Sequence, residues 1–252
     1  MMTSAPAVAD TLSKAEVATR VAAISAALQA AGSEQRRQVA VGYFPTAMRV
    51  WGVPVPQIRT IARQQVASLR GAPAASVVAL ARAVVDEGSM EARQVAYEIL
   101  AAHKPALTAL DEATIEALGR GIDNWASVDC FAVLIAGAAW QKGRVRDATI
   151  ARWAASPDRF WRRAALVCTV PLNMRSRGGK GDVTRTLAVC RQLRADGDDM
   201  VVKAMSWALR ELIPHDSAAV EQFMADHEST LNRRILRETR NKLRTGKKNP
   251  SA

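Results

Sequence analysis

Aromatic residues are scarce in this chain, at 5% of 252 residues, and no segment alternates convincingly between apolar and polar positions. Sheet-rich domains depend on aromatic and β-branched side chains, whereas alanine, which is abundant here, is the best helix former. Hydrophobic residues make up 49% of the chain, an ordinary share for a folded protein, which excludes disorder of the whole. The composition therefore predicts an all-α fold.

Long hydrophobic runs are also missing. The longest, at 131–140, is too short to span a bilayer, and the first residues lack the basic start and apolar stretch of a secretory signal. Three cysteines, Cys130, Cys168 and Cys190, form no CxxC pair and leave an odd thiol. These absences predict a reducing, cytoplasmic setting, no membrane association and no metal cluster.

Common catalytic motifs are absent as well. His103, His215 and His227 lie far apart at expected helix ends, so we assign no metal and no cofactor. There is no nucleophile elbow and no Walker-type loop, and the glycine cluster RSRGGKGD at 175–182 lacks the strand that a nucleotide-binding turn requires. We interpret 175–182 as a flexible basic loop, which either touches phosphates or is plain surface.

Positive charge, by contrast, is abundant and unevenly placed. The chain has 35 Lys and Arg against 24 Asp and Glu, a formal net charge of +11. Residues 142–194 carry a net charge of +10 and residues 229–248 one of +7, which leaves −6 for the remainder. Such segregation favours a surface that binds a polyanion over a basic surface that serves only solubility.

Helix signals recur along the whole chain. Ser13 and Glu16 form a capping-box pattern ahead of a periodic run that Gly32 closes. Pro and Gly residues separate the later periodic segments, which predicts short helices joined by short connections. Further helices are predicted at 34–42, 55–69, 73–86, 89–103, 111–120, 125–141, 146–155, 158–169, 182–195, 198–213, 216–226 and 229–244.

About thirteen short helices in one chain do not suit a four-helix bundle. Successive helix pairs at intervals of roughly 35 to 45 residues favour an α-solenoid of HEAT-like repeats, whose stacking leaves an extended concave groove, here expected to be basic. No linker is long enough to divide the chain. We therefore predict a single domain over 1–252, with residues 1–12 and 246–252 disordered.

One aromatic and one acidic residue lie close together in the segment DNWASVDCF. Trp125 stands in the first turn of an expected helix, and Asp129 follows four residues later, so an indole and a carboxylate share one helix face. Helix spacing therefore sets a large aromatic face beside a carboxylate near the start of a helix, where side chains tend to be reachable.

A second aromatic position lies in VVKAMSWALREL, where Lys203, Trp207 and Arg210 follow the spacing of one helical face. A stripe of basic and aromatic side chains suits a nucleic-acid backbone and its bases, and core packing is the alternative for the indole.

Several segments occur together in an informative order. They are YFPTAMRVWGVP (43–54), DNWASVDCF (123–131), FWRRAAL (160–166), VVKAMSWALREL (201–212) and the closing stretch RRILRETRNKLRTGKKNP (233–250). Together they resemble the DNA alkylation repair family of AlkD-like DNA glycosylases, over about residues 35–248. The W-x-S-V-D and K-A-x-x-W-x-L-R-E strings are fairly specific in combination.

The resemblance implies a HEAT-like α-solenoid that holds duplex DNA in its groove and removes N3- or N7-alkylated purines by hydrolysing the N-glycosidic bond. By position it implies Asp129 as the catalytic carboxylate, Trp125 and Trp207 as the aromatic contacts at the lesion, Tyr43 as a further aromatic there, and Arg163 as a contact to the DNA backbone. Arg162, beside Arg163, leaves open which of the two arginines faces the groove.

These residue types suit that reaction. An alkylated purine of this kind is positively charged, so it leaves without being protonated. As the bond breaks, the sugar develops oxocarbenium character, and a carboxylate such as Asp129 stabilises that charge or orients the attacking water. An indole face such as that of Trp125 attracts a cation by roughly 0.5 to 2 kcal/mol per contact.

Basic residues along the groove are expected to neutralise phosphates. The candidates are Arg163, Lys203, Arg210, Arg233, Arg234, Arg237 and Lys242, while Arg240 and Arg244 face either DNA or solvent. The leading hypothesis is a monomeric, monofunctional DNA glycosylase that needs no cofactor and acts on cationic 3-methyladenine or 7-methylguanine type bases in duplex DNA. The alternatives are a non-catalytic HEAT-like protein that binds damaged or branched DNA, and a protein-interaction scaffold.

Overall fold

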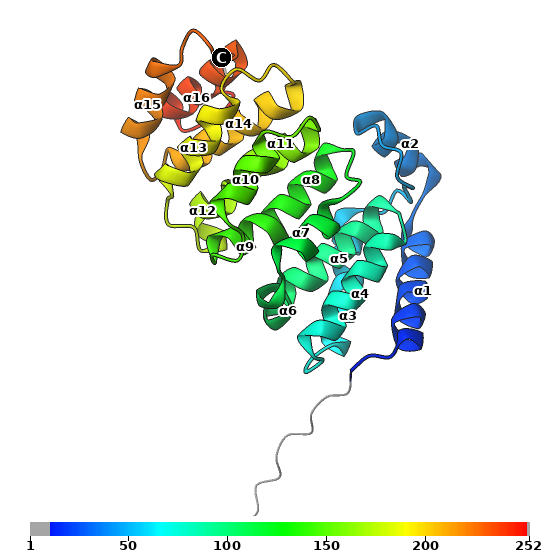
Figure 1. Cartoon of the computed structure of the whole chain (residues 1–252). Coiled ribbons are helices and arrows are strands. Elements are labelled where there is room, and N and C mark those ends of the chain that lie inside the picture. Colours follow the sequence, from blue (N-terminus) through cyan, green and yellow to red (C-terminus); the bar gives the residue numbers. More distant parts are fainter. Residues whose placement is uncertain (1–10, 251–252) are drawn as a thin grey trace, which may run out of the picture. The chain divides into compact units, whose positions relative to one another are not determined.

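The computed structural model describes residues 11–250 (Figure 1). The chain divides after Leu110 into two compact units. All regular elements of the described residues are helices, apart from an isolated bridge between Arg49 and Ser89. The all-α prediction is therefore confirmed for this part of the chain. Disorder was predicted for residues 1–12 and 246–252, of which 1–10 and 251–252 lie outside the described residues. In the described part, Leu12 donates its N–H to the hydroxyl of Ser76 at 3.0 Å, and the carbonyl oxygen of Lys248 accepts from Asn241 at 3.1 Å.

The first unit packs its helices around α5. Its elements are α1 (Lys14–Ala31), α2 (Glu34–Tyr43), α3 (Val55–Ser68), α4 (Ala74–Asp86), α5 (Met90–Ala102) and α6 (Lys104–Ala109). Helices α3 and α4 pack on α5, and α1 packs on α4, through side chains such as Leu80, Val84, Val95 and Ile99, which are fully buried. The predicted capping box is confirmed, because Ser13 and Glu16 exchange both of its hydrogen bonds.

A buried carboxylate fixes the segment that leads into α3. Glu91 on α5 is 1% exposed and accepts hydrogen bonds from the backbone N–H groups of Trp51, Gly52 and Val53, at 3.0, 2.8 and 3.3 Å. Gly52 has a φ of 72°, in the left-handed region that favours glycine. Three hydrogen bonds to one charged group offset the cost of removing that group from water.

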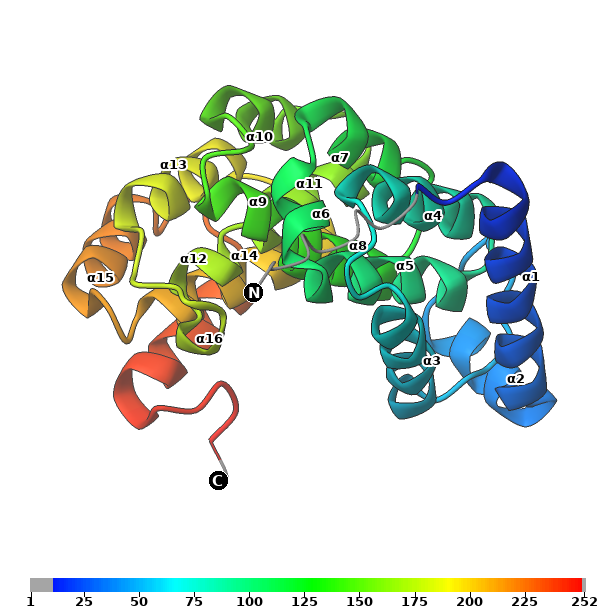
Figure 2. The same cartoon turned by 90° about the horizontal axis from the view of Figure 1, so that it is seen from below.

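Helix α2 follows α1 in the chain (Figure 2). It contributes no buried residue to the first unit. Ser33 caps its first turn by accepting a hydrogen bond from the N–H of Arg36. Val39 is 70% exposed and Tyr43 69% exposed, so Tyr43 lies on the surface of this unit. No contact in the structure tests its predicted role at a lesion.

The second unit is built around α11 and α14. Its elements are α7 (Glu112–Gly119), α8 (Trp125–Phe131), the π-helical turn η1 (Ala132–Ala136), α9 (Gly137–Gln141), α10 (Asp147–Ala154), α11 (Arg159–Val167), α12 (Val170–Asn173), the 3₁₀ turn η2 (Arg175–Arg177), α13 (Val183–Leu193), α14 (Asp199–Leu212), α15 (Ser217–Asp226) and α16 (Arg233–Thr245). Helix α11 packs on α8, α10 and α14, and α14 packs in turn on α16. Helix α11 thus contacts two helices that precede it in the chain, α8 and α10, and one that follows it, α14.

The helix predicted over 125–141 is helical throughout but not regular. A π turn at 132–136 interrupts it, directly after α8. At Gly137 the backbone passes close to the end of α11, because an added Cβ would lie 2.7 Å from the carbonyl oxygen of Cys168. The irregular turn and the glycine together allow this close approach of two backbones.

Candidate functional site

An ion pair joins three helices of the second unit. On α11, Arg163 donates from Nε to Oδ1 of Asp129 at 2.8 Å and from Nη2 to Oδ2 at 2.7 Å. It therefore binds the carboxylate of Asp129, on α8, at both oxygens. Its Nη1 donates to the carbonyl oxygen of Met200, at the start of α14, at 2.6 Å. One guanidinium therefore fixes Asp129 relative to α11 and α14.

The pair is mostly buried but Asp129 remains reachable. The side chain of Arg163 is 7% exposed and that of Asp129 is 17% exposed. Burial raises the pKa of Asp129 above its usual range, and the hydrogen bonds and charge of Arg163 oppose that shift. Each carboxylate oxygen has a second acceptor position. Asp129 is thus a poorly hydrated, oriented anion with acceptor capacity to spare.

The local sequence explains how α8 presents this anion. Asn124 caps the helix, with its side-chain oxygen accepting the N–H of Ser127 at 2.8 Å. Trp125 is the first residue of α8 and is half-buried. Because Asp129 follows one helical turn later, both side chains leave the same side of α8, as predicted.

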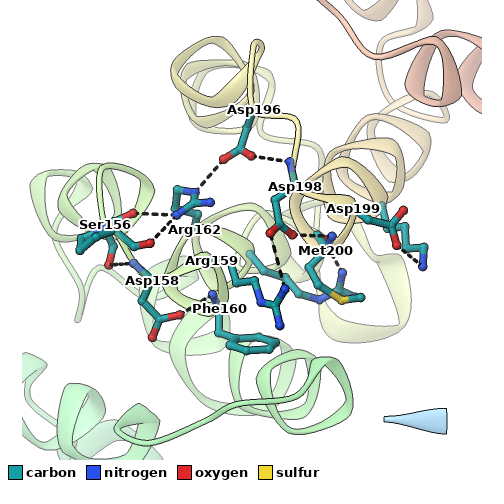
Figure 3. A network of polar contacts seen from close by, with 12 residues as sticks. Ser156, Asp158, Arg159, Phe160, Arg162, Asp196, Asp198, Asp199 and Met200 are labelled. Carbon is teal, nitrogen blue, oxygen red and sulfur yellow. Dashed lines mark hydrogen bonds and ion pairs between the residues drawn. The ribbon is translucent and has the colours of Figure 1, made fainter. Parts of the chain in front are cut away.

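The two neighbouring arginines of α11 have different partners. Arg162 pairs with Asp196 at 2.7 Å and donates to the carbonyl oxygens of Ser156 and Pro157, which ties the start of α11 to the loop before α14 (Figure 3). Arg163 is the arginine that meets Asp129. Arg163 is thus the neighbour of Asp129, and which of the two arginines faces a DNA groove remains a prediction.

Arg163 was also predicted to contact the DNA backbone. Its Nε, Nη1 and Nη2 atoms all donate within the protein, and the side chain is buried. A buried guanidinium needs a counter-charge, and Asp129 supplies it. Orientation of Asp129 is therefore the role that the observed geometry gives to Arg163, while the phosphate contact remains a prediction.

Trp207 lies on α14, with its Nε1 donating to Glu211 at 3.0 Å, and it is half-buried. It follows Met200 by seven residues, close to two helical turns, so both residues lie on the same side of α14. Met200 in turn contacts Arg163 through its carbonyl oxygen. The Met200 contact is made by its backbone, so it fixes α14 beside the Asp129 site without placing the Trp207 side chain there, and convergence of Trp125, Asp129 and Trp207 remains a prediction.

The other cations predicted on α14 are partly engaged. Lys203 pairs with Asp199 at 2.5 Å, one turn earlier on the helix surface. Arg210 donates from Nε to the hydroxyl of Ser206 at 3.3 Å, and burial lowers the pKa of its guanidinium. Both side chains are half-buried, and their predicted DNA contacts remain predictions.

Helix α16 divides its basic residues between two sides. Arg234 donates to Glu238 at 2.8 Å and to Asp199 at 3.2 Å, and Lys242 donates to the carbonyl oxygen of Gly246 at 2.7 Å. A shallow groove on the other side is lined by Arg233, Leu236, Arg237, Arg240, Asn241 and Arg244. Of the predicted set, Arg233 and Arg237 therefore line this groove, and Arg240 and Arg244 join them.

The histidines have structural contacts. His103 accepts the N–H of Ala106 at 3.1 Å, His215 contacts the carbonyl oxygen of Asn173 at 2.6 Å, and His227 packs on the ring of Phe223. Across residues 11–250, no group of three or more His, Cys, Asp and Glu side chains is arranged to hold a metal ion. Nor does any helix in that range have the length and apolarity that a bilayer crossing requires.

Comparison with known proteins identifies the family of the chain. The sequence pattern that defines the family described as DNA alkylation repair enzyme matches residues 24–243, so the chain belongs to that family. A solved structure described as a predicted DNA alkylation repair enzyme from Enterococcus faecalis superposes with a TM-score of 0.69, covering 85% of this chain and 97% of that chain. The two chains are 17% identical, so this likeness shows the fold. A search of curated protein sequences gave no significant match.

Proposed function

We propose that the protein is a DNA glycosylase that hydrolyses the N-glycosidic bond of cationic alkylated purines in duplex DNA. The observation that carries the proposal is the partly buried carboxylate of Asp129, held at both oxygens by Arg163, one helical turn after Trp125. Membership of the DNA alkylation repair enzyme family supports DNA as the substrate.

The geometry of Asp129 suits a reaction whose transition state is a cation. A positively charged base is already a good leaving group, so the protein need supply only stabilisation of the sugar and a positioned water. A fixed anion in a poorly hydrated site stabilises an adjacent positive charge by several kcal/mol, as an order of magnitude, while one indole contributes about 1 kcal/mol. Arg163 fixes the carboxylate in advance, so little reorganisation is needed when the bond breaks.

The direct experiment is incubation of the protein with duplex DNA that contains 7-methylguanine, followed by chromatography for the free base. Release of the intact base without strand cleavage is the expected result for a monofunctional glycosylase. Absence of free base from this substrate and from a 3-methyladenine duplex would contradict the proposal.

Variants then assign the chemistry. Asp129→Asn is expected to lower excision far more than Trp207→Ala, and to leave binding of the duplex nearly intact. Asp196→Asn is a matched control, because Asp196 forms a similar half-buried pair with the neighbouring Arg162, at 2.7 Å. Equal effects of Asp129→Asn and Asp196→Asn on excision would assign Asp129 a structural role instead.

One observation favours a second function, a DNA-binding protein without catalysis. Both oxygens of Asp129 are bound by Arg163, and the same guanidinium bonds to α14, which is also what a purely structural contact between helices looks like. In that case the wild-type protein binds duplex DNA with strong salt dependence and releases no base. The free-base assay separates the two functions.

A further inference from the structure

The basic loop between α12 and α13 carries three exposed cations. They are Arg175 and Arg177 of η2 and Lys180, and among the described residues none of them forms an ion pair. Three like charges within six residues repel one another at close range. Such a cluster without counter-charges indicates a surface for a polyanion when the backbone beneath it is held in place.

Hydrogen bonds of the buried residue Asn173 hold the loop backbone in place, which corrects the flexible loop expected from the sequence. Asn173 is 2% exposed and donates from Nδ2 to the carbonyl oxygen of Thr169 and the hydroxyl of Thr186, at 3.1 and 2.9 Å. Its Oδ1 accepts the N–H of Asp182 at 2.8 Å, and its carbonyl oxygen contacts Nε2 of His215 at 2.6 Å. A fully satisfied buried network therefore fixes both ends of the loop.

The glycines of the loop fit that fixed path. Gly178 has a φ of 77°, and Gly179 donates its N–H to the carbonyl oxygen of Met174 at 3.0 Å. An added Cβ at Gly179 would lie 2.6 Å from the carbonyl oxygen of Pro171, so the backbone there is tightly packed. A loop with a fixed backbone presents its cations with less loss of conformational entropy on binding than a mobile one.

The loop and the Asp129 site are anchored at opposite ends of α14. Arg163 bonds to Met200 at the start of α14, whereas His215, which contacts Asn173, donates its N–H to Leu212 at the end of that helix. Met200 and Leu212 are separated by twelve residues of α-helix, which is about 18 Å along the axis. For a duplex that runs along α14, an offset of that length corresponds to roughly five base pairs, at about 3.4 Å per nucleotide of one strand.

We infer that the loop at 175–180 binds phosphates of the nucleic-acid backbone several base pairs from the lesion, and that it adds affinity that does not depend on sequence. The choice of DNA as the polyanion rests on the proposed function and on the family. The loop contributes binding and positioning of the duplex, and takes no part in the chemical step.

A charge-matched pair of variants tests this inference. The loop variant Arg175→Gln/Arg177→Gln/Lys180→Gln is compared with Lys142→Gln/Arg144→Gln/Arg191→Gln, in which three exposed cations of the same unit are neutralised. Because both triple variants lose the same net charge, long-range effects of charge are equal in the two. The measurement is the Kd for an undamaged 20-base-pair duplex over a series of salt concentrations.

For the loop variant we expect affinity at low salt to fall by about tenfold or more. The slope of log K against log salt should become shallower by about 2 to 3, since each lost phosphate contact removes roughly 0.9. Equal changes in both triple variants would overturn the inference. So would an unchanged duplex Kd in the loop variant combined with lost binding to phosphatidylserine vesicles, which would assign the loop to an anionic membrane.

A second variant tests the fixed backbone itself. Gly179→Ala keeps every cation but forces the loop backbone to move, so we expect weaker duplex binding at unchanged charge, with folding checked by thermal unfolding. Wild-type affinity in a folded Gly179→Ala protein would contradict a preformed surface. These binding measurements use undamaged DNA, so their outcome does not depend on whether the protein releases 7-methylguanine. If it does, the single-turnover rate of base release at saturating enzyme should be the same in the loop variant and the wild type.

Discussion

A double-mutant cycle on Asp129 and Arg163 tests whether the ion pair is the structural centre of the site. Arg163→Met removes the counter-charge but keeps most of the side-chain volume, which leaves a carboxylate that is only 17% exposed. Breaking a buried pair from one side costs about 3 to 5 kcal/mol, because the remaining charge is uncompensated. Asp129→Asn removes the counter-charge of the guanidinium but leaves it one amide oxygen as an acceptor. We therefore expect this variant to lose about 2 to 3 kcal/mol in free energy of unfolding.

The double variant separates pairing from packing. With both charges gone, no uncompensated ion remains, so its loss in free energy of unfolding should be smaller than the two single losses added together by about 2 to 3 kcal/mol. Urea unfolding followed by tryptophan fluorescence suits this measurement, because five of the six tryptophans lie in the second unit. Losses that add to within about 0.5 kcal/mol would show that the two side chains do not depend on each other.

Three further predictions concern pH and packing. Burial raises the pKa of Asp129, and protonation removes the anion. The single-turnover rate of excision should therefore fall about tenfold per pH unit below that pKa and stay level above it. A fall of the rate at alkaline pH would contradict a leaving group that needs no acid. Glu91→Ala leaves three backbone N–H groups without their acceptor and should lower the free energy of unfolding by about 3 kcal/mol or more, and Glu91→Gln by about half as much, as measured by urea unfolding. Gly137→Ala should cost about 1 to 3 kcal/mol in thermal unfolding because of its contact with Cys168, whereas Gly42→Ala, in a helix with open space around it, should be neutral or stabilising.

Helix positions were readable from the sequence wherever a capping residue precedes a periodic run. The helix predicted at 198–213 is found at Asp199–Leu212, with Asp198 as its cap, and the one predicted at 182–195 is found at Val183–Leu193, with Asp182 as its cap. Local hydrogen bonds fix these ends, so local sequence predicts them. The helix predicted from 229 begins only at Arg233, because Asn232 provides the cap there.

Two short helices were missed because proline was interpreted only as a separator. Pro105 lies in the first turn of α6, and Pro171 lies in the first turn of α12. In the first turn the missing N–H has no intrahelical partner in any case, so proline is compatible with a helix start. The π turn at 132–136 had no signal in the sequence, and neither had the close approach of Gly137 beside it to Cys168 at the end of α11, a contact between segments far apart in the chain.

The candidate site was only partly predictable. Trp125 and Asp129 share one helix, so their relation follows from helical geometry alone. Arg163 is 34 residues away from Asp129 along the chain, and only the packing of α11 on α8 brings the two together. The same holds for the contact of Arg234 with Asp199, which depends on how α16 packs on α14, whereas its contact with Glu238 is local to α16 and follows from helical spacing.

The central claim is that Asp129 acts on the reaction itself, and the rate of base release in a single turnover tests it most directly. With enzyme in excess over a duplex that contains 7-methylguanine, the wild type should release the free base and Asp129→Asn should be slower by about a hundredfold or more, the factor expected from losing a few kcal/mol of charge stabilisation. Duplex affinity should be nearly the same for both proteins. A rate for Asp129→Asn within about threefold of the wild type would contradict the account.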